Sequence, residues 1–333
     1  MSVFKQEEVL YPEYLPSSLP HRENQIKLLT SHLELLAKNY RPPNVFIFGP
    51  PGVGKTAVVK FVLKEFENYS GIKSIYLNCW QFNTSFSILS EILRSFEIFA
   101  PRRGVAKDEL FFKMVEYLDK SKLNLVLALD EVDMLIKKDQ DVLYDFLRIN
   151  SYTRQKILLI LISNDKYLLR FLEERIRSSL NVEEIEFKPY TFLEMKNIVE
   201  ERMRLAFKSF ENGISALVAN YAVERGGDVR VALNILLKAG RLAKEKLTIE
   251  DVKNVIKDGL KIDEIFSKVL DERENLVLNV FSQPKVISVA YEEIKDRLKV
   301  SERTFRRIID SLIKKNLLKV IGYEKKKMIL SKI

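Results

Sequence analysis

The sequence predicts an α/β protein with a core built on a parallel sheet, an all-α domain after it and a C-terminal winged-helix domain. Strand and helix patterns alternate from Val45 to about Phe187, which is typical of a parallel sheet with helices on both faces. Only helical patterns follow from Thr191 to Gly259. The last 37 residues, 297–333, then carry a net charge of +9, equal to that of the whole chain.

A glycine-rich loop, GPPGVGKT at 49–56, joins the first strand of the core to the next helix. It satisfies the phosphate-binding pattern G-x-x-x-x-G-K-[ST], and an apolar strand and an amphipathic helix flank it in the required order. Glycines allow backbone N–H groups to turn inward around phosphate oxygens, and the helix N-terminus adds partial positive charge. The order of the elements disfavours the alternative, a Gly/Pro turn before a helix.

The loop therefore predicts a site for ATP or ADP with Mg²⁺. We expect Lys55 to reach the β- and γ-phosphates and the Thr56 hydroxyl to ligate the metal. The residues predicted to hold the nucleotide through the loop are Gly49, Pro51, Gly52, Val53, Gly54, Lys55, Thr56 and Ala57.

Two adjacent acidic residues end the strand predicted at 125–129. Carboxylates at the end of a buried strand are costly without a cation or water to receive them. We expect Asp130 to anchor Mg²⁺ and Glu131 to polarise the attacking water. The alternative is a solvated acidic turn in which Asp133 caps a helix.

An asparagine follows the next apolar strand, at 157–162. Because the carboxyl ends of parallel strands meet at one edge of a sheet, Asn164 is expected to hydrogen-bond both the γ-phosphate and the attacking water. An ordinary turn asparagine is the alternative interpretation.

Composition narrows the class of protein. The 333 residues are 47% hydrophobic, which suits two or three globular domains. Cys79 is the single cysteine, so an intramolecular disulfide and a cysteine-based zinc site are excluded. Apolar runs are too short for a membrane span, and the N-terminus lacks the pattern of a secretory signal. We expect a cytoplasmic protein without a membrane partner.

Breaks in the pattern predict the domain boundaries. Helical periodicity from His21 to about Tyr40 ends at Arg41-Pro42-Pro43, and Lys188-Pro189-Tyr190 marks the exit from the core. Thr248 is a predicted N-cap, with Asp251 three positions later. The predicted parts are a lead-in at 1–20, the core at 21–187, the all-α domain at 188–261 and the winged helix at 262–333.

The pattern of the C-terminal part predicts a helix-turn-helix followed by a β-hairpin. Helical patterns cover 274–281, 290–298 and 301–315, and the last two are joined by the tight Lys299-Val300 turn. Ser301 is a plausible N-cap. Strands are expected at 317–321 and 327–330, about Gly322.

Positive charge is concentrated in this C-terminal part. Residues 297–333 contain 12 basic and 3 acidic residues, which indicates a nucleic-acid surface. The start of the second helix would contact bases and phosphates, and the hairpin tip would contact the backbone or the minor groove. The predicted DNA-binding residues are Arg303, Thr304, Arg306 and Arg307 on the helix and Lys325, Lys326 and Lys327 on the hairpin. A protein-binding winged helix with a solvated basic face is the alternative.

Over nearly its whole length, the chain resembles the archaeal replication initiators, which are related to the largest subunit of the origin recognition complex and to cell-division-cycle protein six. The segment Leu19-Pro20-His21-Arg22-Glu23 is similar to the family's motif before the first helix. RIRSSL at 175–180 and GGDVRVALNIL at 226–236 resemble the family's arginine-finger and second-sensor regions. The resemblance implies an AAA+ ATPase core with an α-helical lid.

Further roles follow from this resemblance. Arg175 takes the place of the arginine finger, although Glu173-Glu174 stands where the family often has Asp-Pro. A surface arginine that pairs with nearby glutamates is the alternative. Arg230 is placed near the γ-phosphate, and Tyr190 and Arg202 match lid positions that contact nucleotide. The family also carries a DNA-contacting insertion between the positions of Cys79 and Asp119, which makes Arg102 and Arg103 candidates there; an ordinary basic loop is the alternative.

The implied function is that of a replication initiator associated with the nucleoid. It would bind origin duplex DNA together with other initiator copies, use slow ATP hydrolysis as a switch and help to load the replicative helicase. A nucleotide-gated transcription regulator is one alternative. A clamp-loader ATPase is another, although the Ser-Arg-Cys finger motif of that class is missing here.

Overall fold

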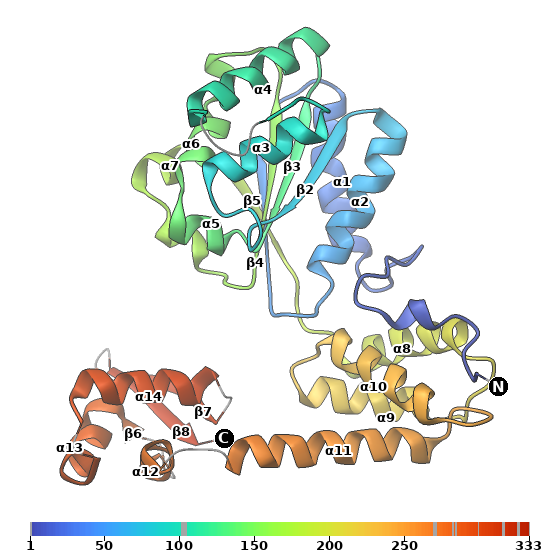
Figure 1. Cartoon of the computed structure of the whole chain (residues 1–333), viewed down its shortest axis with the longest axis vertical. Helices are drawn as coiled ribbons and strands as arrows, with labels where there is room; N and C mark the ends of the chain where they lie inside the picture. Colours follow the sequence, from blue (N-terminus) through green and yellow to red (C-terminus); the bar gives the residue numbers. More distant parts are fainter. Residues whose placement is uncertain are drawn as a thin grey trace. The chain divides into compact units, whose positions relative to one another are not determined.

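The computed structural model describes residues 2–100, 105–268, 272–281, 283, 285–298, 300–314, 317–324 and 327–332. It divides into two compact units, Met1–Val252 and Lys253–Ile333. The boundary predicted after residue 261 falls inside a continuous helix, α11 (Ile249–Lys268) (Figure 1). In the part of the chain that the structure describes, no helix is long and apolar enough to cross a membrane.

A five-stranded parallel sheet forms the centre of the first unit, as predicted. Its strands are β1 (Asn44–Phe48), β2 (Lys73–Asn78), β3 (Leu125–Asp130), β4 (Ile157–Ser163) and β5 (Val182–Glu186), in the order β2-β3-β4-β1-β5. Every residue of β3 and β4 is buried, which explains their near-continuous apolar sequences. The register pairs Phe48 with Ser163 and Asn78 with Asp130. The segments that follow β1, β3 and β4 therefore meet at one edge.

Helices cover both faces of this sheet (Figure 1). On one face lie α1 (Glu23–Ala37) and α2 (Lys55–Ser70); on the other lie α3 (Ser85–Ser95), α4 (Lys107–Ser121), α5 (Asp133–Lys138), α6 (Asp141–Leu147) and α7 (Glu174–Ser179). Alternate strand residues belong to different cores, since Val126 packs with the first group and Leu127 with the second. Helix α1 is shorter than predicted because His21 and Asn39 have left-handed backbones, with φ of 64° and 62°.

The all-α lid consists of α8 (Phe192–Ala206), α9 (Ile214–Glu224) and α10 (Val229–Leu242). Thr191 and Glu194 form a capping box at the start of α8. Gly213 precedes α9 with a left-handed φ of 92°. The predicted cap of α11 is confirmed, because Thr248 Oγ1 accepts from Asp251 N at 3.2 Å.

The N-terminal residues were predicted to be a lead-in, but they pack on the lid. Phe4 stacks on Phe207 with ring centroids 5.1 Å apart, and Lys5 N donates to Ala206 O at 2.7 Å. The short helix η1 (Glu7–Leu10) contacts α8 and α10. These contacts join residues about 200 positions apart, so local periodicity could not reveal them.

The second unit has the architecture of a winged helix. Its elements are α12 (Glu272–Val280), β6 (Lys285–Val286), α13 (Ile287–Leu298), α14 (Glu302–Lys314), β7 (Leu318–Glu324) and β8 (Lys327–Lys332). The three strands form an antiparallel sheet in the order β6-β8-β7. Ser301 Oγ accepts from Thr304 N at 3.3 Å, as expected of an N-cap.

Two details of the hairpin differ from the prediction. Gly322 is not at its turn but inside β7, at a shift in register, and β7 continues to Glu324. Glycine within a strand often marks such an irregularity. The two-residue strand β6 was not predicted, because two residues are too few for an alternating pattern.

Candidate nucleotide site

The glycine-rich loop lies between β1 and α2 and has the predicted backbone. Gly52 and Gly54 are left-handed, with φ of 71° and 91°. A Cβ atom on Gly49 would lie 2.2 Å from the Phe187 carbonyl oxygen, and one on Gly52 would lie 1.8 Å from Asp228 Oδ1. Glycine is therefore required where the loop passes against the core and the lid.

Lys55 is the first residue of α2 and its side chain is buried within the loop. Its Nζ donates to Gly49 O at 2.7 Å, to Pro50 O at 2.8 Å and to Asn164 Oδ1 at 2.7 Å. Burial lowers the pKa of Lys55 to about 8, against the opposing effect of Asp130. The structure thus joins the predicted phosphate lysine to Asn164, 109 positions later.

Thr56 and Asp130, the two residues predicted to hold Mg²⁺, are also in contact. Thr56 Oγ1 donates to Asp130 Oδ2 at 2.6 Å, and the Tyr76 hydroxyl donates to the same oxygen at 2.7 Å. Burial together with Asp130 raises the pKa of Tyr76. A buried carboxylate beside a hydroxyl is the oxygen donor set that Mg²⁺ prefers, so these residues fit the metal. Tyr76 lies on β2 and carries no motif, and the sequence did not indicate it.

Glu131 follows Asp130 with a left-handed backbone, φ 54°. Its Oε2 accepts a hydrogen bond from the indole N–H of Trp80 at 2.8 Å. Its own N–H donates to Asp130 Oδ1 at 2.8 Å. Positive φ is costly in a residue other than glycine, and such strain clusters at active sites as well as in turns. Trp80 was not predicted to belong to the site.

A cavity of about 330 Å³ connects these groups with the lid. The core contributes the loop, Asp130, Glu131 and Asn164, and the lid contributes Arg202 and Arg230. Residues 11–15 of the N-terminal segment complete the wall. Most of the predicted nucleotide residues, though not Gly49, Val53 or Tyr190, therefore line one cavity together with an N-terminal segment to which the sequence had assigned no role.

Arg230 lines this cavity with its guanidinium held by Asp228. Its Nη2 lies 2.6 Å from Asp228 Oδ2, and its backbone N–H donates to Asp228 Oδ1 at 2.8 Å, which makes Asp228 the N-cap of α10. The Asp228 carboxylate raises the pKa of Arg230. Val229 N donates to Gly52 O at 3.2 Å. The start of α10 is therefore attached directly to the phosphate loop.

The two other predicted lid residues are placed differently. Arg202 lines the cavity, donates from Nη1 to Val9 O at 3.1 Å and lies 5.0 Å from the ring centre of Tyr14. Tyr190 is buried and lines a smaller neighbouring cavity of about 80 Å³, beside Gly54. Only Arg202 of this pair therefore lines the larger cavity.

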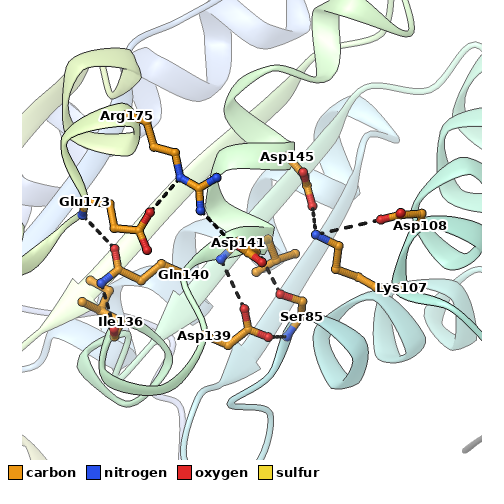
Figure 2. Close-up of polar contacts among 11 residues, drawn as sticks. Ser85, Lys107, Asp108, Ile136, Asp139, Gln140, Asp141, Asp145, Glu173 and Arg175 are labelled. Atoms are coloured by element: carbon orange, nitrogen blue, oxygen red, sulfur yellow. Dashed lines mark hydrogen bonds and ion pairs between the residues drawn. The ribbon is translucent and has the colours of Figure 1, made fainter.

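Arg175 lies on α7 with 49% of its side chain exposed. Its Nε donates to Glu173 Oε2 at 2.7 Å and its Nη2 to Asp141 Oδ1 at 2.8 Å (Figure 2). The ring centre of Tyr144 lies 5.1 Å from its guanidinium carbon. These acidic partners raise the pKa of Arg175. Arg175 is not among the residues that line the cavity of its own chain.

Four of the predicted DNA-binding residues of the second unit lie in the first two turns of α14. Arg303, Arg306 and Arg307 are exposed and Thr304 is half-buried. Arg306 Nη2 lies 2.8 Å from Glu302 Oε1, one helical turn earlier. Lys327 begins β8. Arg102, Arg103, Lys325 and Lys326 lie outside the described residues.

Two family models match the chain: "AAA domain" over residues 38–172 and "Cdc6 AAA+ ATPase-type lid domain" over residues 196–257. The ORC1-type DNA replication protein 1 of Methanosarcina mazei is 33% identical, with 96% of this chain and 84% of the relative covered. The ORC1-type DNA replication protein of Pyrococcus abyssi is 34% identical, with 96% and 83% covered.

Solved structures agree with these matches. The ORC1 protein of Aeropyrum pernix, in complex with DNA, is 28% identical with a TM-score of 0.71, and 99% of this chain and 93% of that chain are covered. The ORC2 protein of the same organism, in ADPNP–ADP complexes, shares the fold with a TM-score of 0.77 at 18% identity, with 99% and 94% covered. Together with the phosphate loop, the acidic strand end and the lid, these relatives show that the chain belongs to the ORC1-type DNA replication proteins, AAA+ ATPases with a Cdc6-type lid.

Proposed function

We propose that this protein is a replication initiator that binds origin duplex DNA and uses an ATP/ADP switch to help load the replicative helicase. The observation that carries the proposal is the cavity in which Lys55, Glu131 and Asn164 of the core face Arg202 and Arg230 of the lid. A nucleotide bound there touches both parts at once, so the presence of a γ-phosphate can shift the equilibrium between their arrangements.

The proposed hydrolysis uses residues that line this cavity. When phosphate oxygens enter the loop, the Lys55 ammonium exchanges the carbonyls of Gly49 and Pro50 for them. Asn164, now bonded to Lys55, can then orient the attacking water, and Glu131 accepts a hydrogen bond from that water. Thr56 and Asp130 would hold Mg²⁺, and the metal would supply positive charge that stabilises phosphoryl transfer.

We expect hydrolysis by one copy to be slow. Phosphoryl transfer is accelerated by an arginine that stabilises charge in the transition state. Arg175 is bound to Glu173 and Asp141 and lies outside the cavity lining of its own chain. A second copy on the same DNA would have to supply this arginine.

The second unit supplies the proposed DNA contacts. In a helix-turn-helix, the first residues of the second helix reach base edges in the major groove. Arg303, Arg306 and Arg307 occupy this place on α14. The Aeropyrum pernix ORC1 structure contains DNA, which supports DNA binding by this protein. Lys325, Lys326 and Lys327 remain proposed contacts to the DNA backbone or minor groove. Arg102 and Arg103 remain candidates for a second DNA contact.

The proposal is tested by DNA binding to origin-containing and random duplexes across a range of salt concentrations. Arg306→Ala/Arg307→Ala should abolish the preference for origin DNA, because each good base contact contributes about 1–3 kcal/mol of discrimination. Lys295→Ala/Arg297→Ala removes the same charge from exposed positions of α13 and should retain the preference. Equal binding of both duplexes by the unmodified protein would contradict the origin-binding role.

A further inference from the structure

Arg22 is a buried arginine directly against the glycine-rich loop. Its exposure is 4%, and it belongs to the 19–23 segment, whose role the proposed function leaves open. Nε donates to Val53 O at 3.0 Å, Nη2 to Lys188 O at 3.0 Å and Nη1 to His21 O at 3.1 Å. Its guanidinium lies 3.7 Å from the ring centre of Tyr190.

Burying this cation is costly unless it is compensated. Three hydrogen bonds of Arg22 end on backbone carbonyl oxygens. The faces of Tyr190 and Phe187, at 3.7 and 5.4 Å, provide further electrostatic compensation. A planar guanidinium that binds carbonyls in several directions holds backbone geometry, which a flexible ammonium cannot do equally well.

The bond to Val53 orients a peptide of the phosphate loop. In a trans peptide, the carbonyl of one residue and the N–H of the next point in opposite directions. With the Val53 carbonyl directed at Arg22, the Gly54 N–H is directed to the opposite side of this peptide. A Cβ on Gly54 would lie 2.9 Å from the Tyr190 hydroxyl and 3.9 Å from Arg22 Nε, so the loop rests directly on this pair.

The bond to Lys188 reaches the connection between core and lid. Lys188 follows β5, which ends at Glu186, and precedes α8, which begins at Phe192. One rigid guanidinium therefore bonds both the phosphate loop and this connection. A movement of the loop on phosphate binding would displace the Arg22 guanidinium, which is also bonded to the core–lid connection at Lys188.

We propose that Arg22 is a positioning residue of the nucleotide site, which presets the Val53–Gly54 peptide for phosphate binding and couples the loop to the core–lid connection. The inference rests on the proposed nucleotide binding. Arg22 touches no reacting atom in this arrangement. Its loss should therefore weaken nucleotide binding and raise KM, while kcat at saturating ATP stays within about twofold of the unmodified protein.

The test is the Kd of a fluorescent ADP analogue, mant-ADP, for the full chain carrying Arg22→Met or Arg22→Lys. We expect Arg22→Met to bind about 30-fold more weakly and Arg22→Lys about tenfold, since the ammonium cannot bridge both carbonyls. Arg41→Met is the matched control: Arg41 also donates to a backbone carbonyl, Leu147 O at 3.0 Å, but precedes β1 at the end opposite the loop. Its Kd should be unchanged.

Wild-type affinity in a folded Arg22→Met protein, verified by circular dichroism, would overturn the proposal. If Arg22→Met does not fold, the Kd of Arg22→Lys is the test. Wild-type affinity in Arg22→Lys would also overturn the proposal. A fall in kcat with unchanged KM would also contradict a positioning role. A different result would show that the proposed nucleotide binding itself is wrong: the unmodified protein would then bind mant-ADP no better than Lys55→Ala does.

Discussion

The Trp80 indole N–H donates to Glu131 Oε2 at 2.8 Å, so the chain's single tryptophan is bonded to the carboxylate proposed to polarise water. The indole is otherwise 61% exposed. We expect Glu131→Ala to make Trp80 more accessible to acrylamide, because the bond that restrains the ring is lost. Glu131→Gln keeps an acceptor oxygen and should behave like the unmodified protein. Equal fluorescence quenching in all three proteins would show that the bond does not form in solution.

The pKa of Lys55 should make nucleotide binding depend on pH. In the nucleotide-free protein, burial lowers this pKa to about 8, whereas bound phosphates stabilise the ammonium and raise it. Above pH 8 the free lysine is neutral, so ADP binding must take up a proton and the affinity should fall as pH rises. Calorimetry at pH 9 in two buffers of different ionisation enthalpy measures the uptake.

Lys55→Arg provides the control for this pH dependence. A guanidinium remains charged over the whole range, so any remaining ADP affinity should lose most of its dependence between pH 8 and 9.5. The same proton uptake in both proteins would assign the effect to a different group.

Asp228 caps α10 and should contribute to the stability of the lid. Asp228→Ala removes the acceptor of the Arg230 N–H, and the loss of such a cap costs about 1 kcal/mol. Asp228→Asn keeps a capping oxygen and should unfold at nearly the wild-type urea concentration, measured by circular dichroism. If the alanine and asparagine variants are equally destabilised, the contribution comes from the charge of Asp228 and not from its cap.

Arg175 should act on the nucleotide of a second copy. Lys55→Ala lacks a working phosphate loop but keeps Arg175, and Arg175→Ala has the reverse properties. We expect each variant alone to hydrolyse ATP at most at one tenth of the wild-type rate on origin DNA, and their mixture to recover part of it. Arg177→Ala, on the same exposed helix, is the control and should remain active. A mixture no more active than its components would contradict action between copies.

The phosphate loop, the acidic strand end, the position of Asn164 and the alternation that specifies the parallel sheet could all be predicted from the sequence. Each depends on residues close together in the chain, where periodicity and glycine geometry act. The sequences of β3 and β4 are apolar runs because both strands are buried. Since the strands are parallel, the polar residues that follow them lie at the same edge of the sheet. The start of α14 could also be predicted from the sequence, because Ser301 and the tight turn before it mark the beginning of a helix.

The distant groups that complete the site are visible only in the folded chain. Tyr76 and Trp80 carry no motif, and Asp228 had no assigned role within the segment 226–236. The bonds of Tyr76 to Asp130 and of Trp80 to Glu131, and the close approach of Asp228 to Gly52, depend on how strands, loops and lid pack. Arg22 lies 31 positions from Val53 and 166 from Lys188. Burial selects such contacts, because a desolvated charge or carbonyl must find a partner wherever the fold places one. Sequence periodicity reports which face of an element is buried, but not what that face meets.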